Sequence, residues 1–240
     1  MDHEYSNKKL CVLGELCERS RKFLIHTMQP VFASIWKLFE DKIFSVPSQP
    51  AGRHPFFNPY HDCLPALELS QAQHLRRENL HNYLAHFRIT PTLLILGEAP
   101  GWRGCRFSGV PFTGEAQLTS GELPFSGKRA SLTRAVRGME VFTDSHAPAS
   151  TTGYREASAS IFWRTLAAYS QQFLVWNVFP FHPHQAGEPC SNRRPGLTET
   201  DGYLPCLQQL VERLSPEHIR AVGNFARSEE RRVGKECRSR

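Results

Sequence analysis

Two short runs of almost uninterrupted apolar residues constrain the fold of this chain more than any other feature. They are Thr92-Leu-Leu-Ile-Leu96 and Phe173-Leu-Val-Trp-Asn-Val178, and a turn residue follows each of them, Gly97 or Pro180. Runs of this length that lack an apolar/polar alternation are typical of strands buried on both faces of a parallel sheet. We therefore expect two buried strands here.

Segments with a helical spacing of apolar residues lie before, between and after these two runs. We expect helices over residues 21–44, 66–87, 156–169 and 198–214 and a third strand over residues 218–222, with Pro30 starting or kinking the first helix. This alternation predicts an α/β protein whose parallel sheet carries helices on both faces. Ligands of such sheets bind beyond the carboxyl ends of the strands, so the loops after the two apolar runs are candidate sites.

The loop after the first strand opens with Gly97-Glu98-Ala99-Pro100-Gly101. A proline that stiffens this turn and two glycines that free its backbone can hold the Glu98 carboxylate rigidly over a cleft. A turn whose glutamate is only solvated fits the same residues equally well. The stretch from Gly97 to Gly104 lacks the Gly-Lys-Ser/Thr ending of a phosphate-binding P-loop, which argues against nucleoside triphosphate chemistry.

Two further residues stand out for their surroundings. Phe112 lies between proline and glycine in Ser108-Gly-Val-Pro-Phe-Thr-Gly114, so a rigid loop presents its ring, which suits stacking on a planar base. Packing in the core is the commoner role of such a residue. Asn177 lies in an otherwise apolar strand, where its amide either matches one edge of a pyrimidine base or bonds to a neighbouring loop.

The spacing of histidines and cysteines argues against a metal site. His182, His184 and Cys190 share a proline-rich loop without a nearby cluster of carboxylates, which is a weak pattern for zinc. The seven cysteines include no C-x-x-C pair, so neither a disulfide scaffold nor a zinc ribbon is expected. We expect reduced thiols and no metal.

Charge and hydropathy bound the class of protein. The formal net charge is +6, but the last fourteen residues carry six Lys or Arg and three Glu, so half of that charge lies in a short tail and supports a DNA partner only weakly. No apolar run approaches the roughly 20 residues that span a bilayer. Charges throughout the first thirty residues argue against a secretory signal. We expect a cytoplasmic protein without membrane contact.

Taken in order, the three motifs resemble the uracil-DNA glycosylase superfamily, closest to the class whose first motif is Gly-Glu-Ala-Pro-Gly. The resemblance covers about residues 42–226. It implies a three-layer α/β/α sandwich around a short parallel sheet. It also implies a base-excision repair enzyme that flips uracil out of DNA and hydrolyses its N-glycosidic bond without a metal or another cofactor.

The resemblance implies a role for each matching residue. Glu98 would be catalytic, because it would orient or activate the water that attacks the sugar. Phe112 would stack on the flipped base, and Asn177 would read the edge of uracil. The turn would line the substrate pocket with Gly97, Ala99, Pro100 and Gly101.

The chain departs from the family pattern in two places. The class with Glu in its first motif usually holds an iron–sulfur cluster on four cysteines; Cys190 and Cys206 lie near its second pair, but Cys63 stands alone in place of the first. We expect no cluster. The family also places a His-Pro-Ser type motif after a fourth strand, whereas here residues 227–240 are charged, without apolar periodicity, and resemble a translated adapter sequence. We expect the fourth strand to be missing.

These patterns together predict the organisation of the chain. We expect an N-terminal extension with a helix over residues 1–41, an incomplete glycosylase-like domain over residues 42–226, and a non-native tail over residues 227–240. The expected protein is a monomer that acts on DNA containing uracil, and it is inactive if the truncation removes a needed histidine. The alternatives are a glycosylase for another deaminated base, hypoxanthine or xanthine, or a non-catalytic DNA-binding or interaction fragment.

Overall fold

The computed structural model describes residues 28–132, 153–228 and 232. Its centre is a parallel sheet in the order β3-β2-β5, formed by β2 (Leu93–Gly97), β3 (Phe173–Asn177) and β5 (His218–Ala221). The register places Gly97 beside Asn177, so the ends of the first two strands lie side by side. Both apolar runs are strands, and the predicted parallel α/β fold is confirmed. The first residues of the expected N-terminal helix and most of the expected tail lie outside the described residues.

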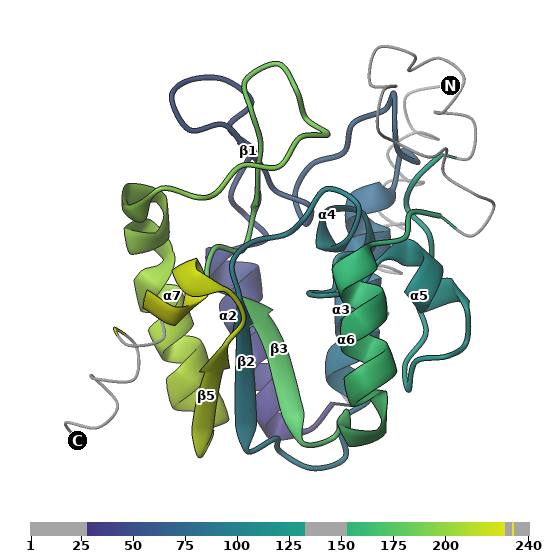
Figure 1. Cartoon of the computed structure of the whole chain (residues 1–240), viewed down its shortest axis with the longest axis vertical. Coiled ribbons are helices and arrows are strands. Elements are labelled where there is room, and N and C mark those ends of the chain that lie inside the picture. Colours follow the sequence, from purple (N-terminus) through teal and green to yellow (C-terminus); the bar gives the residue numbers. More distant parts are fainter. Residues whose placement is uncertain (1–27, 133–152, 229–231, 233–240) are drawn as a thin grey trace, which may run out of the picture.

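Helices cover the sheet (Figure 1). The longer ones are α2 (Pro30–Lys42), α3 (Ala72–Ala85), α6 (Ala157–Leu166), which continues as η2 (Ala167–Tyr169), and α7 (Leu197–Leu214). Two shorter helices, α4 (Cys105–Ser108) and α5 (Glu115–Thr119), lie in the segment that follows β2. None of the described helices combines the length and the apolar character needed to cross a membrane.

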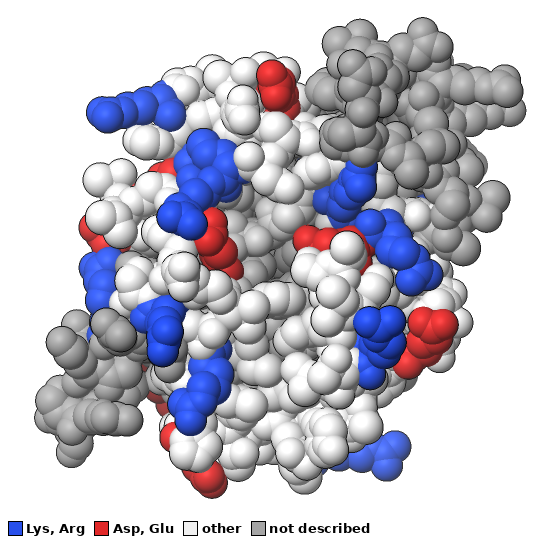
Figure 2. Space-filling model, in the orientation of Figure 1, with Lys and Arg blue, Asp and Glu red and all other residues white. Residues whose placement is uncertain are grey.

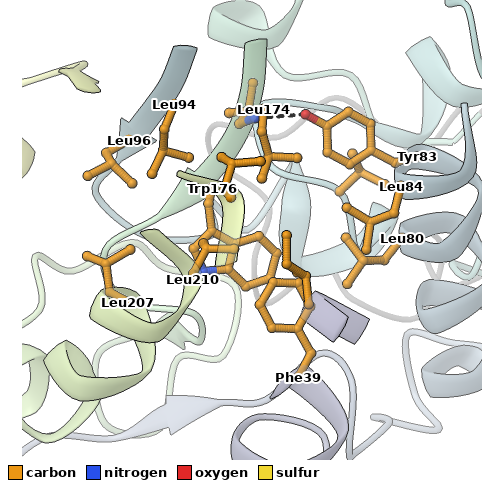
Figure 3. Packing of buried hydrophobic residues seen from close by; sticks show 14 of the residues in the cluster. Phe39, Leu80, Tyr83, Leu84, Leu94, Leu96, Leu174, Trp176, Leu207 and Leu210 are labelled. Atoms are coloured by element: carbon orange, nitrogen blue, oxygen red, sulfur yellow. Dashed lines mark hydrogen bonds between the residues drawn. The ribbon is translucent and has the colours of Figure 1, made fainter. Parts of the chain in front are cut away.

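Successive side chains of the strands point to opposite faces of the sheet, and the hydrophobic core lies on both faces. On one face Leu94, Leu96, Leu174 and Trp176 lie among side chains of α2, α3 and α7 (Figure 3). The Trp176 indole stacks on Phe39 of α2, with ring centroids 4.2 Å apart. On the other face the rings of Phe162 and Trp163, from α6, contact Phe173 at centroid distances of 5.7 and 6.0 Å.

One edge of the sheet is open among the described residues. β5 pairs only with β2, and its residues alternate between exposed and half-buried. His218 and Arg220 are exposed, and 45% of the Val222 side chain just beyond them is accessible. The sheet therefore has the three strands expected from the sequence, and no fourth strand pairs with β5 in the part of the chain that the structure describes.

Two local features differ from the sequence expectations. α3 begins at Ala72 rather than near residue 66, because residues 67–69 form a turn whose backbone bonds to residues 130–132. The segments between α2 and α3 and between β3 and α7, for which no strand was expected, contain a short antiparallel pair, β1 (Phe56–Phe57) with β4 (His182–Pro183). This pair brings the loop that follows β3 back across the carboxyl end of the sheet.

Candidate active site

Gly97 and Asn177 form the floor of the candidate site at the carboxyl ends of β2 and β3. They are register partners, and the Asn177 side chain is folded over the glycine: a Cβ on Gly97 would lie 2.6 Å from Asn177 Oδ1. Asn177 is only 4% exposed. No hydrogen bond joins its amide to any described residue, and the amide atoms keep some contact with solvent, which leaves them available to a ligand. The interpretation that Asn177 bonds to a neighbouring loop therefore has no support here.

Phe112 approaches the same glycine from the loop between α4 and α5. Its ring atom Cε2 would lie 2.4 Å from a Cβ on Gly97. The Phe112 backbone is left-handed, at φ 51°, a conformation that costs a non-glycine residue about 1–3 kcal/mol and needs support from its surroundings. Phe162 stacks on this ring at 4.9 Å, so the ring is fixed from one side.

Hydrogen bonds supply the support that the Phe112 backbone needs. The buried Ser108 hydroxyl donates to Thr113 O at 2.5 Å and accepts from Val110 N at 3.0 Å. The Trp163 indole N–H donates to Thr113 Oγ1 at 2.9 Å, which ties the loop to α6. The ring of Phe112 is therefore presented by a braced loop, as the proline and glycine around it predict, and it also packs against the main core.

Glu98 lies at the border between the site and solvent. A third of its side chain is exposed, and its Oε1 is 3.7 Å from Arg194 Nε. The backbone beneath it is fixed, since Val178 N donates to Gly97 O at 2.9 Å and Phe179 N donates to Glu98 O at 3.0 Å. The carboxylate thus stands on a rigid base with one loose ionic contact, which leaves it free to hold a water.

The rest of the turn is anchored by the loop that follows β3. The His182 ring contacts Pro100 O through Nδ1 at 2.8 Å and Pro189 O through Nε2 at 3.2 Å. Complete burial, helped by the nearby Arg106 guanidinium, lowers the pKa of His182 to about 3, so the ring is neutral and has a single N–H. Both contact atoms are carbonyl oxygens, which only accept, so this single N–H donates to one of them; donation through Nδ1 would fasten the ring to Pro100 O.

No metal-binding arrangement accompanies the site. Within the described ranges, no three His, Cys, Asp or Glu side chains are grouped so that they can hold a metal ion. Cys190 packs with Trp102 and Phe107 in a small cluster, whereas Cys206 belongs to the main core on α7.

Sequence reasoning missed one acidic residue that the structure places against the turn. Glu156 is the residue before α6, and its carboxylate packs onto Gly101 and Gly104. Burial raises the pKa of this carboxyl group. The sequence offered no signal beyond the start of a helix, because the contact joins segments more than fifty positions apart in the chain.

The site combines an aromatic ring that can stack on a planar base, an amide that can bond to the edge of the base, and a carboxylate. The Phe112 ring and the Asn177 amide meet over Gly97, whose missing side chain leaves the space they need. Glu98 follows one residue later at the rim. Such a set can bind a base by stacking and by one amide edge while a carboxylate activates water beside it.

Comparison with known proteins gives a family match. The family model of the uracil DNA glycosylase superfamily matches residues 84–236. Among the solved structures that match is wild-type SMUG2 of Pedobacter heparinus, at 16% sequence identity and a TM-score of 0.36, over 87% of this chain and 96% of that chain. No curated protein matches the chain.

Proposed function

The chain belongs to the uracil DNA glycosylase superfamily, and from that membership we propose that it removes uracil from DNA by hydrolysing the N-glycosidic bond. The observation that supports the choice of base is the Asn177 amide, which lies next to the Phe112 ring and has no hydrogen bond to any described residue. One amide offers a donor and an acceptor, and the uracil edge needs both.

In this mechanism the flipped uracil stacks on Phe112 and bonds to Asn177. The bond between the base nitrogen and the sugar carbon breaks, and its electron pair leaves with the base as a stabilised anion. Glu98 holds a water against the sugar carbon and takes its proton as the new carbon–oxygen bond forms. Gly97, Ala99, Pro100 and Gly101 line the pocket, and its work is positioning and electrostatic stabilisation.

We further propose a cytoplasmic monomer that acts on DNA containing uracil. The proposed domain remains residues 42–226, with residues 1–41 as an extension and residues 227–240 as a non-native tail.

The proposal is tested by single-turnover release of the base from oligonucleotides, with enzyme in excess so that a slow step still registers. Glu98→Gln should reduce uracil release by at least about 100-fold, because a positioned general base contributes about 10²–10⁴-fold, while DNA affinity persists. Glu217→Gln, a change of an exposed residue outside the site, is the matched control.

The same assay decides between the alternatives. Faster release of hypoxanthine or xanthine than of uracil would show that the base is a different one. DNA binding without release of any of the three would favour a non-catalytic role. An unchanged rate in Glu98→Gln would remove that residue from the mechanism.

A further inference from the structure

A second pocket opens beside the turn that carries the candidate site. It encloses about 400 Å³ and is lined by Trp102, Arg103, Arg155, Glu156, Ala157, Ser158 and Asn192. Trp102 directly follows Gly101, so this pocket and the proposed base pocket share one loop. Figure 2 shows a face of the molecule that is hollowed near its centre, with acidic side chains and Lys or Arg side chains around the hollow.

Glu156 is the acidic group of this second pocket. A Cβ on Gly104 would lie 2.1 Å from Glu156 Oε2, and one on Gly101 would lie 2.6 Å from Oε1. The Glu156 carboxyl group therefore occupies the space that side chains at positions 101 and 104 would fill, so both positions need glycine. Ser158 is its hydrogen-bond partner, and burial raises its pKa. In its ionised form this carboxyl group has two oxygens and one side-chain partner, so it can accept further hydrogen bonds from a ligand in the pocket.

Positive charge lies at the rim of the same pocket. Arg155 is exposed and makes no ion pair with any residue in the described ranges. Arg103 lies with its guanidinium 4.9 Å from the centre of the Trp102 ring, at the pocket wall. Cationic side chains at an open rim are the usual contacts of a nucleic-acid phosphate.

The charges of the pocket restrict what it can hold. A phosphate alone would meet the Glu156 carboxyl group at the floor, and a metal cation would meet two arginines and a single carboxylate. A ligand that presents hydrogen-bond donors at one end and a phosphate at the other satisfies both regions. A nucleotide with an amino-bearing base has this arrangement, and the volume lies in the range of small-molecule sites.

We propose that this pocket is a subsite for the nucleotide next to the excised one in the same DNA strand, with Glu156 accepting hydrogen bonds from its base and Arg155 facing its phosphate. The inference rests on the proposed action on DNA, because that substrate brings a neighbouring nucleotide to this loop. In a single strand, where the Watson–Crick edge is unpaired, guanine offers two adjacent donors to a carboxylate, N1–H and N2–H, whereas thymine presents one donor between two carbonyl oxygens.

The test is equilibrium binding of the 240-residue protein to single-stranded oligonucleotides with a tetrahydrofuran abasic-site analogue at the target position. Each of the four bases is placed in turn on its 5′ and 3′ sides, and affinity is read by fluorescence anisotropy. Guanine should bind about tenfold tighter than thymine on one of the two sides. Because nothing is excised, the result does not depend on whether uracil is the substrate.

Variants assign the preference to the pocket. Glu156→Gln, of equal size, should bring the guanine-to-thymine ratio close to one, since the amide can pair with either base. Arg155→Ala should weaken all four sequences equally and lower the salt dependence of binding by about one ion. Arg164→Ala, exposed near the other end of α6, is the control and should keep the ratio.

Two results would overturn the proposal. One is equal affinity for all flanking bases in the unaltered protein. The other is a preference that persists in a folded Glu156→Gln protein, with folding checked by circular dichroism. Should that variant not fold, the flanking-base panel on the unaltered protein and on Arg155→Ala still decides.

Discussion

At the scale of single residues, Gly97 leaves room for two side chains that reach it from distant parts of the chain. An alanine there would place its Cβ 2.4 Å from the Phe112 ring and 2.6 Å from Asn177 Oδ1. Gly97→Ala should therefore displace both groups and reduce single-turnover uracil release by at least about tenfold, since misplacement of about 1 Å costs as much or more.

Gly202→Ala is the matched control for this prediction. Gly202 lies within α7, and a Cβ there meets no atom within 4 Å. Alanine should be neutral or stabilise the helix by up to about 1 kcal/mol. Equal activity of the two alanine variants would show that Phe112 and Asn177 do not form the base pocket.

The proximity of these residues could be foreseen, and that of Glu156 could not. Asn177 and Gly97 end neighbouring apolar runs, and the carboxyl ends of parallel strands meet at one edge, so their proximity follows from local patterns. Glu156 reaches Gly101 and Gly104 only because α6 is docked beside the turn. Such a contact depends on packing between distant segments, which no local period encodes.

At the scale of elements, the loop between α4 and α5 holds Phe112 in a left-handed backbone through Ser108. The Ser108 side chain is buried and bonds both Val110 N and Thr113 O. Ser108→Ala should leave these backbone groups unpaired and lower the free energy of unfolding by about 1–3 kcal/mol. With the loop loosened, KM for uracil-containing DNA should rise more than kcat falls.

Denaturant unfolding and steady-state kinetics measure the two effects. Ser34→Ala is the control, because Ser34 donates only to Val31 O within α2. A Ser108→Ala protein as stable as this control would show that the loop needs no such brace.

Helices and strands could be predicted where a segment buries apolar residues at a regular spacing. The two central strands match their apolar runs to within one residue at each end. The predicted start of α3 was wrong. The apolar residues near Leu67 have a helical spacing, but they pack into the small cluster around Trp102. The pairing of β1 with β4 gave no signal, since each strand has two residues in a proline-rich loop.

At the scale of the whole molecule, a buried ionic group joins α3 and α4 to the segment that precedes α3. Glu68 Oε1 lies 3.1 Å from Arg76 Nη1 and 2.5 Å from Arg106 Nη1, and all three side chains are fully buried. The positive charge of Arg106 also lowers the pKa of the His182 ring. The alternation of strands and helices predicts the fold class, but this ionic group, drawn from three segments, could not be seen in the sequence.

Buried neutral histidines make the folded state sensitive to acid. The pKa of His182 is about 3 in the folded protein, against an ordinary value near 6.5, and burial also lowers the pKa values of His86 and His184. Between about pH 3 and pH 6.5, His182 binds a proton in the unfolded chain but not in the folded chain. Stability is therefore fully present above about pH 6.5 and falls as the pH is lowered. Glu156 opposes this trend, because burial raises its carboxyl pKa.

His182 alone should contribute a slope of up to about 1.4 kcal/mol per pH unit below pH 6.5. Denaturant unfolding at pH 8, 7, 6 and 5 should show a loss of stability that begins near pH 6.5. His182→Asn, whose amide can still donate to Pro100 O, should flatten the slope, whereas His218→Asn on the exposed edge strand should leave it unchanged. Parallel curves for all three proteins would contradict the assignment of a neutral, buried His182, because the pH dependence would then come from other groups.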